Sequence, residues 1–177
     1  HTEIATALIA AGAKVNQAAD DGVTPLFIAC QNGHTETAAA LIAAGAKVNQ
    51  AKDNGATPLF IACQNGHTAT AVALLAAGAA VDQAMNDGAT PPYIATPLYI
   101  ACQNGHLSTV QLLSSYGASR AFVVDGTEET AEEVQGRFRE GSGTEETAEE
   151  VAAHFGDEAV REWLAGSRQW TTPLHHL

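Results

Sequence analysis

The chain has 177 residues, with 8 Lys or Arg against 20 Asp or Glu, so its formal net charge at pH 7 is −12. Most of this charge lies in residues 118–177, which hold 5 basic and 13 acidic side chains. An acidic surface repels nucleic-acid phosphates and anionic lipid, which argues against both as direct partners. No apolar run is long enough to span a bilayer and no signal-peptide pattern opens the chain, so we expect an intracellular, cytoplasmic protein.

One stretch recurs three times along the chain. It reads TPLFIACQNGH at 24–34 and again at 57–67, and TPLYIACQNGH at 96–106. The first two copies start 33 residues apart, and six further residues are inserted before the third. Self-similarity at a fixed period indicates an array of structural repeats.

The residues of one unit predict two helices and a finger. Thr24 is expected to cap a helix that begins at Pro25, where the missing N–H of proline costs nothing. Apolar side chains then recur at helical spacing until Gly33 ends the helix, and a second helix with the same spacing follows. The pair Asn54 and Gly55 suits positive φ, so the chain doubles back as a hairpin-like finger before the next Thr.

This unit resembles the ankyrin repeat, which has a period of 33 residues and a TPLHxA pattern. The resemblance covers residues 1 to about 117 through the TPL motif, the Gly-His pair, the paired aliphatic residues and the GAxVN motif. It implies an all-α fold, an ankyrin-repeat solenoid of stacked antiparallel helix pairs with hairpin-like finger loops. The pairs Leu41/Ile42 and Leu74/Leu75 are then expected to be buried between units.

Of the two histidines typical of an ankyrin repeat, this unit lacks one and keeps the other. The family's His after TPL is replaced by Phe27, Phe60 and Tyr99, so its hydrogen bonds must be made otherwise or be replaced by aromatic packing. The histidine of the Gly-His pair is retained in every copy. The resemblance gives it a structural role, bonding loop backbone, at His34, His67 and His106.

The resemblance also predicts the organisation of the chain. The units are a truncated repeat at 1–23, repeats at 24–56 and 57–89, a repeat with a six-residue insertion at 90–125, a duplicated acidic helix and linker at 126–142, a degenerate ankyrin-like repeat at 143–171 and the start of a further repeat at 172–177. The first unit lacks its first helix, so the leading helix should have an exposed face. We therefore expect a fragment of a longer array.

The insertion is a local duplication, visible as TPPYIA followed by TPLYIA. Pro91 and Pro92 together resist a helix, so the extra residues should lengthen the finger and push Tyr93 and Ile94 outward. An exposed Tyr beside an Ile suits a contact patch. A slipped duplication absorbed without function in a tolerant loop is the alternative, and the low cost of lengthening a loop favours it.

A second duplication lies in the acidic C-terminal third. The sequence GTEETAEEV begins at residue 126 and again 17 residues later, and each copy contains a capping box that starts a helix. Half a unit cannot stack as a whole one, so one copy must leave the solenoid axis. We expect this to be 126–142, because only the second copy is followed by a helix bearing Val160, Trp163 and Leu164.

No residues are arranged for chemistry. P-loop, GxSxG, CxxC and HExxH motifs are all missing, so we expect no catalytic activity, no metal and no cofactor. Cys30, Cys63 and Cys102 occupy one position in three units. The resemblance spaces neighbouring units beyond the ~7 Å Cα separation of a disulfide, so the three thiols should be small buried hydrophobic groups.

The function that follows is a non-enzymatic scaffold that binds a protein partner through its concave helical face and fingers. A different possibility is the targeting or regulatory arm of a larger enzyme, whose catalytic domain lies outside these residues. We expect a monomer with no small-molecule substrate. The finger residues that vary between units are the candidate partner-binding residues, joined by two residues of the insertion: Lys52, Asp53, Asn54, Met85, Asn86, Asp87, Tyr93 and Ile94.

Overall fold

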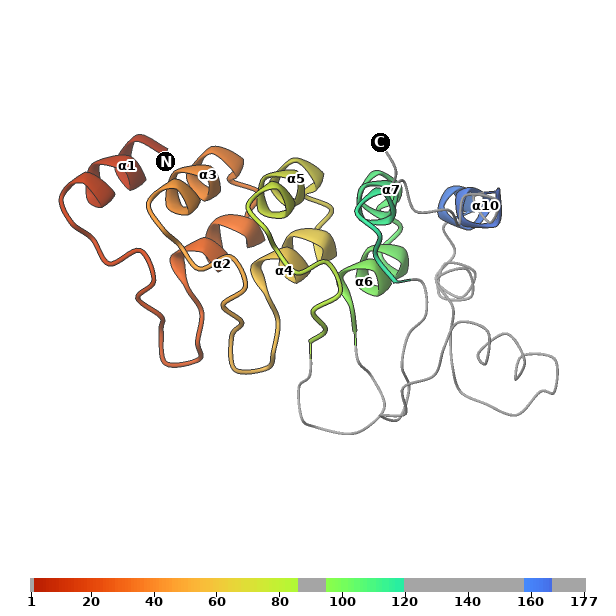
Figure 1. Cartoon of the computed structure of the whole chain (residues 1–177), viewed down its shortest axis with the longest axis horizontal. Coiled ribbons are helices and arrows are strands. Elements are labelled where there is room, and N and C mark those ends of the chain that lie inside the picture. Colours follow the sequence, from red (N-terminus) through yellow and green to blue (C-terminus); the bar gives the residue numbers. More distant parts are fainter. Residues whose placement is uncertain (1, 86–94, 120–157, 167–177) are drawn as a thin grey trace, which may run out of the picture.

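The computed structural model describes residues 2–85, 95–119 and 158–166. Within these ranges it contains eight α-helices and no strand. The helices are α1 (Thr2–Ala10), α2 (Pro25–Gln31), α3 (Thr35–Ala43), α4 (Pro58–Gln64), α5 (Thr68–Ala76), α6 (Pro97–Gln103), α7 (Leu107–Ser115) and α10 (Glu158–Gly166). Figure 1 shows an inner row of α2, α4 and α6 next to the fingers, and an outer row of α1, α3, α5 and α7. The fold is an all-α repeat solenoid, as predicted.

The inner helices begin where the Thr-Pro pairs predict. The Oγ1 of Thr24, Thr57 and Thr96 accepts a hydrogen bond from the backbone N–H three residues later, at 3.2, 3.1 and 3.2 Å. Each Thr lies in extended backbone and the Pro that follows is the first helical residue. The cap satisfies one of the N–H groups that the first turn leaves unbonded.

The Asn-Gly-His turn between the two helices of a unit also locks neighbouring units together. Gly33 has a φ of +68°, which side chains other than glycine rarely adopt. A Cβ there would lie only 2.6 Å from Nδ1 of His67 in the next unit. Gly66 has the same relation to His106. Both the backbone angle and the close approach of the next repeat therefore require glycine.

The core is a strip that runs along the stack. The inner helices pack side by side, α2 on α4 and α4 on α6, and bury Leu26, Leu59 and Leu98 together with all three cysteines. The outer helices contribute Leu41, Leu74 and Leu113. Leu74 and Leu75 are both buried as expected, whereas Ile42 is only partly buried, so burial of the first pair was predicted too strongly.

A backbone hydrogen bond at equivalent positions closes each finger. The N–H of Ala19 donates to the carbonyl of Val23 at 2.9 Å, and that of Lys52 to Ala56 at 3.0 Å. In the third finger the equivalent bond joins Met85 to Ala95 at 2.9 Å. Three residues separate the bonded pair in the first two fingers and nine in the third. The finger-closing bond therefore brackets the insertion.

Polar side chains form hydrogen bonds between successive units. The hydroxyls of Thr35 and Thr70 are 2.8 Å apart, and Thr68 and Thr109 repeat this contact at 2.8 Å one unit further on. Asn49 binds the next unit twice, since its Nδ2 donates to the Gly78 carbonyl and its Oδ1 accepts from the Ala80 N–H. These bonds set the register between units.

The two ends of the described array differ. On α1 the apolar side chains of Ile4 and Leu8 are 64% and 56% exposed, which agrees with the expected exposed face. At the other end α10 lies against α7 (Figure 1). Its Val160 and Leu164 are buried, and Trp163 is partly buried against the same core. The predicted acidic helix at 126–142 lies outside the described residues. Among the described helices, none is both long and apolar enough to cross a membrane.

Candidate binding groove

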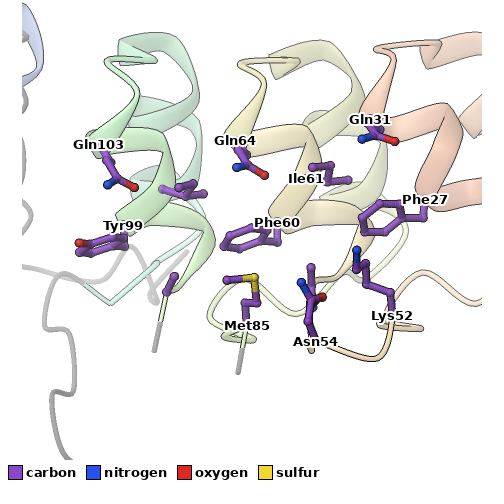
Figure 2. A pocket seen from close by; sticks show the side chains of 13 residues that line it. Phe27, Gln31, Lys52, Asn54, Phe60, Ile61, Gln64, Met85, Tyr99 and Gln103 are labelled. Atoms are coloured by element: carbon purple, nitrogen blue, oxygen red, sulfur yellow. Dashed lines mark hydrogen bonds between the residues drawn. The ribbon is translucent and has the colours of Figure 1, made fainter. Parts of the chain in front are cut away.

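A groove of about 750 Å³ runs along the inner side of the solenoid. Its floor is formed by residues of α2, α4 and α6, and one wall by the second and third fingers (Figure 2). It is continuous over three units because the inner helices stack directly on one another. The repeated sequence consequently places the same side chains at regular intervals along one surface.

The aromatic residues that replace the family's His lie at the base of this groove. Figure 2 shows Phe27, Phe60 and Tyr99 in a row, one from each inner helix. Phe27 and Phe60 are only 4% and 2% exposed, whereas Tyr99 is half-buried. Nζ of Lys52 lies 5.9 Å from the centroid of the Phe27 ring, which allows a cation–π attraction. At Phe27 and Phe60, a buried aromatic ring therefore takes the place of the missing His.

Three glutamines form a second row beside the rings. Gln31, Gln64 and Gln103 are the last residues of α2, α4 and α6, and all three line the groove (Figure 2). Their side-chain amides make no hydrogen bond within the described part of the chain. Each amide therefore offers one acceptor and two donor hydrogens to a ligand.

The backbone beneath these glutamines is held by the following unit. The Gln31 carbonyl is 3.1 Å from Nε2 of His67 and accepts from Nδ2 of Asn65 at 2.8 Å. His106 and Asn104 contact the Gln64 carbonyl in the same way, at 3.0 and 2.8 Å. The structural role expected for the repeated His is confirmed at His67 and His106. It also fixes the helix ends from which the glutamine side chains project.

The structure divides the candidate partner-binding residues. Lys52, Asn54 and Met85 line the groove, and Figure 2 shows them on the finger side. Asp53 lies at the exposed finger tip, where its N–H donates to the Asp21 carbonyl of the preceding finger, and it does not line the groove. The other four, Asn86, Asp87, Tyr93 and Ile94, lie outside the described residues.

Sequence reasoning missed the part of the groove that comes from the helices. Because Gln31 and Gln64 are identical, and partner-specific surfaces usually differ between units, such a surface is hard to recognise from the sequence. The repeated sequence does contain a pattern that points to these residues, since a glutamine is the last residue of the inner helix in every copy. A residue repeated at an exposed or half-exposed helix end is not needed for packing.

Charge is distributed unevenly over this face. Among the described residues that line the groove, Lys52 alone is formally charged, and no carboxylate pairs with it within the described ranges. Asp20, Asp21 and Asp53 are gathered at the exposed tips of the first two fingers. The groove is thus nearly neutral, with one positive charge at the end nearest α2.

Three buried thiols lie behind the groove. They belong to Cys30, Cys63 and Cys102, and none of them forms a disulfide. Burial raises the pKa of the Cys30 thiol from 9.0 to about 12, and burial with a smaller contribution from Cys30 raises the pKa of Cys63. In the described ranges no cluster of His, Cys, Asp and Glu side chains could hold a metal ion. The groove therefore offers contact surface and amide groups.

Comparison with known proteins agrees with this geometry. The family profile for ankyrin repeats (3 copies) matches residues 1–85 and 45–122, which together cover more than half of the chain. No match to a curated protein was found. Ankyrin repeats are generally protein–protein interaction modules and are typically non-catalytic. On its repeated sequence, its stacked helix pairs and this match, the chain belongs to the ankyrin-repeat family.

Proposed function

We propose that this chain is a non-enzymatic scaffold that binds a protein partner in the groove formed by its inner helices and fingers. The observation that carries the proposal is a groove of about 750 Å³ that is continuous over three units and is lined by the side-chain amides of Gln31, Gln64 and Gln103. Concave surfaces of this kind are what solenoid proteins use for binding.

The composition of the lining supports a protein ligand. Apolar and aromatic groups at the floor, such as Ile61 and Tyr99, can exclude water, while the amides at the edge can bond a polypeptide backbone. The repeat-to-repeat bonds of His67 and His106 hold this surface in place before a partner arrives. Such preorganisation reduces the entropy lost on binding.

A displayed library of random linear peptides, selected on the protein, tests the proposal. The double variant Gln64→Glu/Met85→Glu places two charges in the groove at partly exposed positions, so it should fold normally. Gln111→Glu makes a similar change on the exposed side of α7 and is the matched control. Selected peptides should bind the groove variant at least about tenfold more weakly and the control equally well. Peptides that bind all three proteins alike would contradict the proposal.

A further inference from the structure

The three glutamines lie at the spacing of the inner helices. Packed helices have axes about 8–10 Å apart, and α2, α4 and α6 pack in sequence. Gln31, Gln64 and Gln103 hold the same position in their helices, so their amides recur along the groove at this interval. A ligand that bonds all three must present backbone groups with a similar repeat.

A polyproline II helix has that repeat. It has three residues per turn and a rise of 3.1 Å, so equivalent backbone groups recur about every 9.3 Å. In a β-strand, groups on one face recur about every 6.6 Å, and a residue three positions further along the strand points to the opposite face. Two turns of an α-helix measure about 10.8 Å, but its backbone groups are bonded internally and are closed to the amides. Only the polyproline II form satisfies both spacing and bonding.

The floor of the groove defines the side chains of this ligand. The apolar surface contributed by Ile61, Met85 and Tyr99 lies beside the row of amides (Figure 2). When one backbone group per turn bonds a glutamine, one side chain per turn can face this surface. Apolar residues should therefore recur at every third position, with proline favoured because it holds the polyproline II form.

Charge sets the direction of the ligand. Lys52 is the one formally charged side chain among the described residues that line the groove, and it lies over Phe27 at the α2 end. No carboxylate of the described chain pairs with it. Its ammonium is available to a carboxylate of the ligand, so an acidic residue should lie at that end and nowhere else along the groove.

From these observations, and resting on the proposed binding function, we infer that the partner segment is a proline-rich peptide in the polyproline II form. Its apolar residues recur every third position along the row of Gln31, Gln64 and Gln103, and one acidic residue at its end pairs with Lys52.

Fluorescence polarisation with synthetic peptides tests the inference. The first peptide contains repeated Pro-Leu-Ala units with one glutamate, placed at either end in two versions. The second has the same residues reordered so that leucine alternates, and in the third the glutamate is replaced by lysine. The wild-type protein should bind the better version of the first peptide at least about tenfold more tightly than the second and third.

Variants of the protein separate the two parts of the inference. Replacing Gln31, Gln64 and Gln103 by Ala should weaken the first peptide about tenfold without loss of helicity, since alanine favours helices. Lys52→Glu should reverse the preference between the glutamate and lysine peptides. Lys47→Glu carries the same charge change outside the groove and should leave the preference unchanged.

Equal binding of the ordered and reordered peptides would overturn the inference, as would no binding of the ordered peptide. The same holds if Lys52→Glu and Lys47→Glu behave alike. Failure of the proposed binding function is distinguishable, because it would appear in the library selection as peptides indifferent to Gln64→Glu/Met85→Glu. Library peptides that need the groove but lack the three-residue period would leave that function in place and refute only the polyproline II ligand.

Discussion

At the scale of single residues, stability depends on side chains that contact two repeats at once. Leu74 is fully buried in α5, which packs against both α3 and α7. Val72 lies on the same helix and is 43% exposed. The pair allows loss of buried contacts to be separated from helix propensity, because alanine is the best helix former and neither substitution lowers the propensity of α5.

Leu74→Ala should lower the free energy of unfolding by about 2 to 5 kcal/mol, since it leaves a cavity between units. Val72→Ala should change it by no more than about 0.5 kcal/mol, as expected for an exposed position. Urea unfolding followed by circular dichroism measures both. A loss below about 0.5 kcal/mol for Leu74→Ala would show that the packing register is wrong.

The buried thiols give a second prediction at this scale. The pKa of Cys30 is raised from 9.0 to about 12 by burial, so the folded protein keeps this thiol neutral where the unfolded chain ionises it. The stabilising contribution is present in full below pH 9 and is lost as the pH rises from 9.0 towards about 12. Urea unfolding between pH 8 and 11 should show stability falling over this window.

Thiol labelling is the independent check. Cys30, Cys63 and Cys102 should resist a thiol reagent in the native protein at pH 8 and react together once urea unfolds it, because the neutral buried thiol is a poor nucleophile. Reaction of any of the three before unfolding would show that the inner helices open locally.

At the scale of an element, the same sequence acquires different surroundings in different units. The segment PLFIACQ forms both α2 and α4, yet Ile28 is 45% exposed and the equivalent Ile61 is 8% exposed. α4 has an inner helix on each side, whereas among the described helices only α4 flanks α2 in the inner row. Period and capping residues predicted both helices, but burial was set by neighbours.

The candidate site also has a part that the sequence predicted and a part that depends on how the units stack. The fingers were predicted from the Asn54-Gly55 pair and the recurrence of the unit, and Lys52, Asn54 and Met85 do line the groove. The row of glutamines was missed, because the row forms only where helices 33 or more residues apart in the sequence stack side by side. Contacts such as that of Thr68 with Thr109 were missed for the same reason. Local pattern predicts elements, and stacking determines which side chains meet.

The insertion gives a prediction at the element scale. Deleting residues 90–95 joins Ala89 to Thr96, so Ala89 can take the place of Ala95 in the finger-closing bond with Met85, as Ala56 does with Lys52. Helicity and the melting temperature should therefore remain unchanged. If Tyr93 and Ile94 form a contact patch, the deletion should abolish binding of peptides selected from the library.

Two results of this deletion would contradict the prediction. Binding that survives the deletion would leave the slipped duplication as the only interpretation of the insertion. A fall in melting temperature would show that the longer finger is needed for packing. In the intact chain the bond between Met85 and Ala95 closes this finger as Lys52–Ala56 closes the preceding one, which argues against such a need.

At the scale of the whole molecule, a solenoid has no central core, and its stability is approximately a sum of unit and interface terms. The buried cluster nevertheless runs without a break from α2 to α10. Val160 and Leu164 of α10 cover α7, which would otherwise present apolar surface at this end. The acidic C-terminal third thus includes a helix that terminates the described stack.

The duplicated acidic segments make this terminal arrangement testable. Deleting residues 126–142 removes the first copy and leaves the second copy joined to α10, whose Val160 and Leu164 pack on α7. Stability should stay the same or rise, because the deletion shortens the connection to α10 and removes acidic side chains from a chain of net charge −12. Urea unfolding followed by tryptophan fluorescence measures this stability.

Leu164→Ala is the contrasting variant and should lower the free energy of unfolding by about 2 to 5 kcal/mol, since it empties a fully buried position. A large loss of stability on deleting 126–142, with Leu164→Ala nearly silent, would assign the stacking role to the first copy instead.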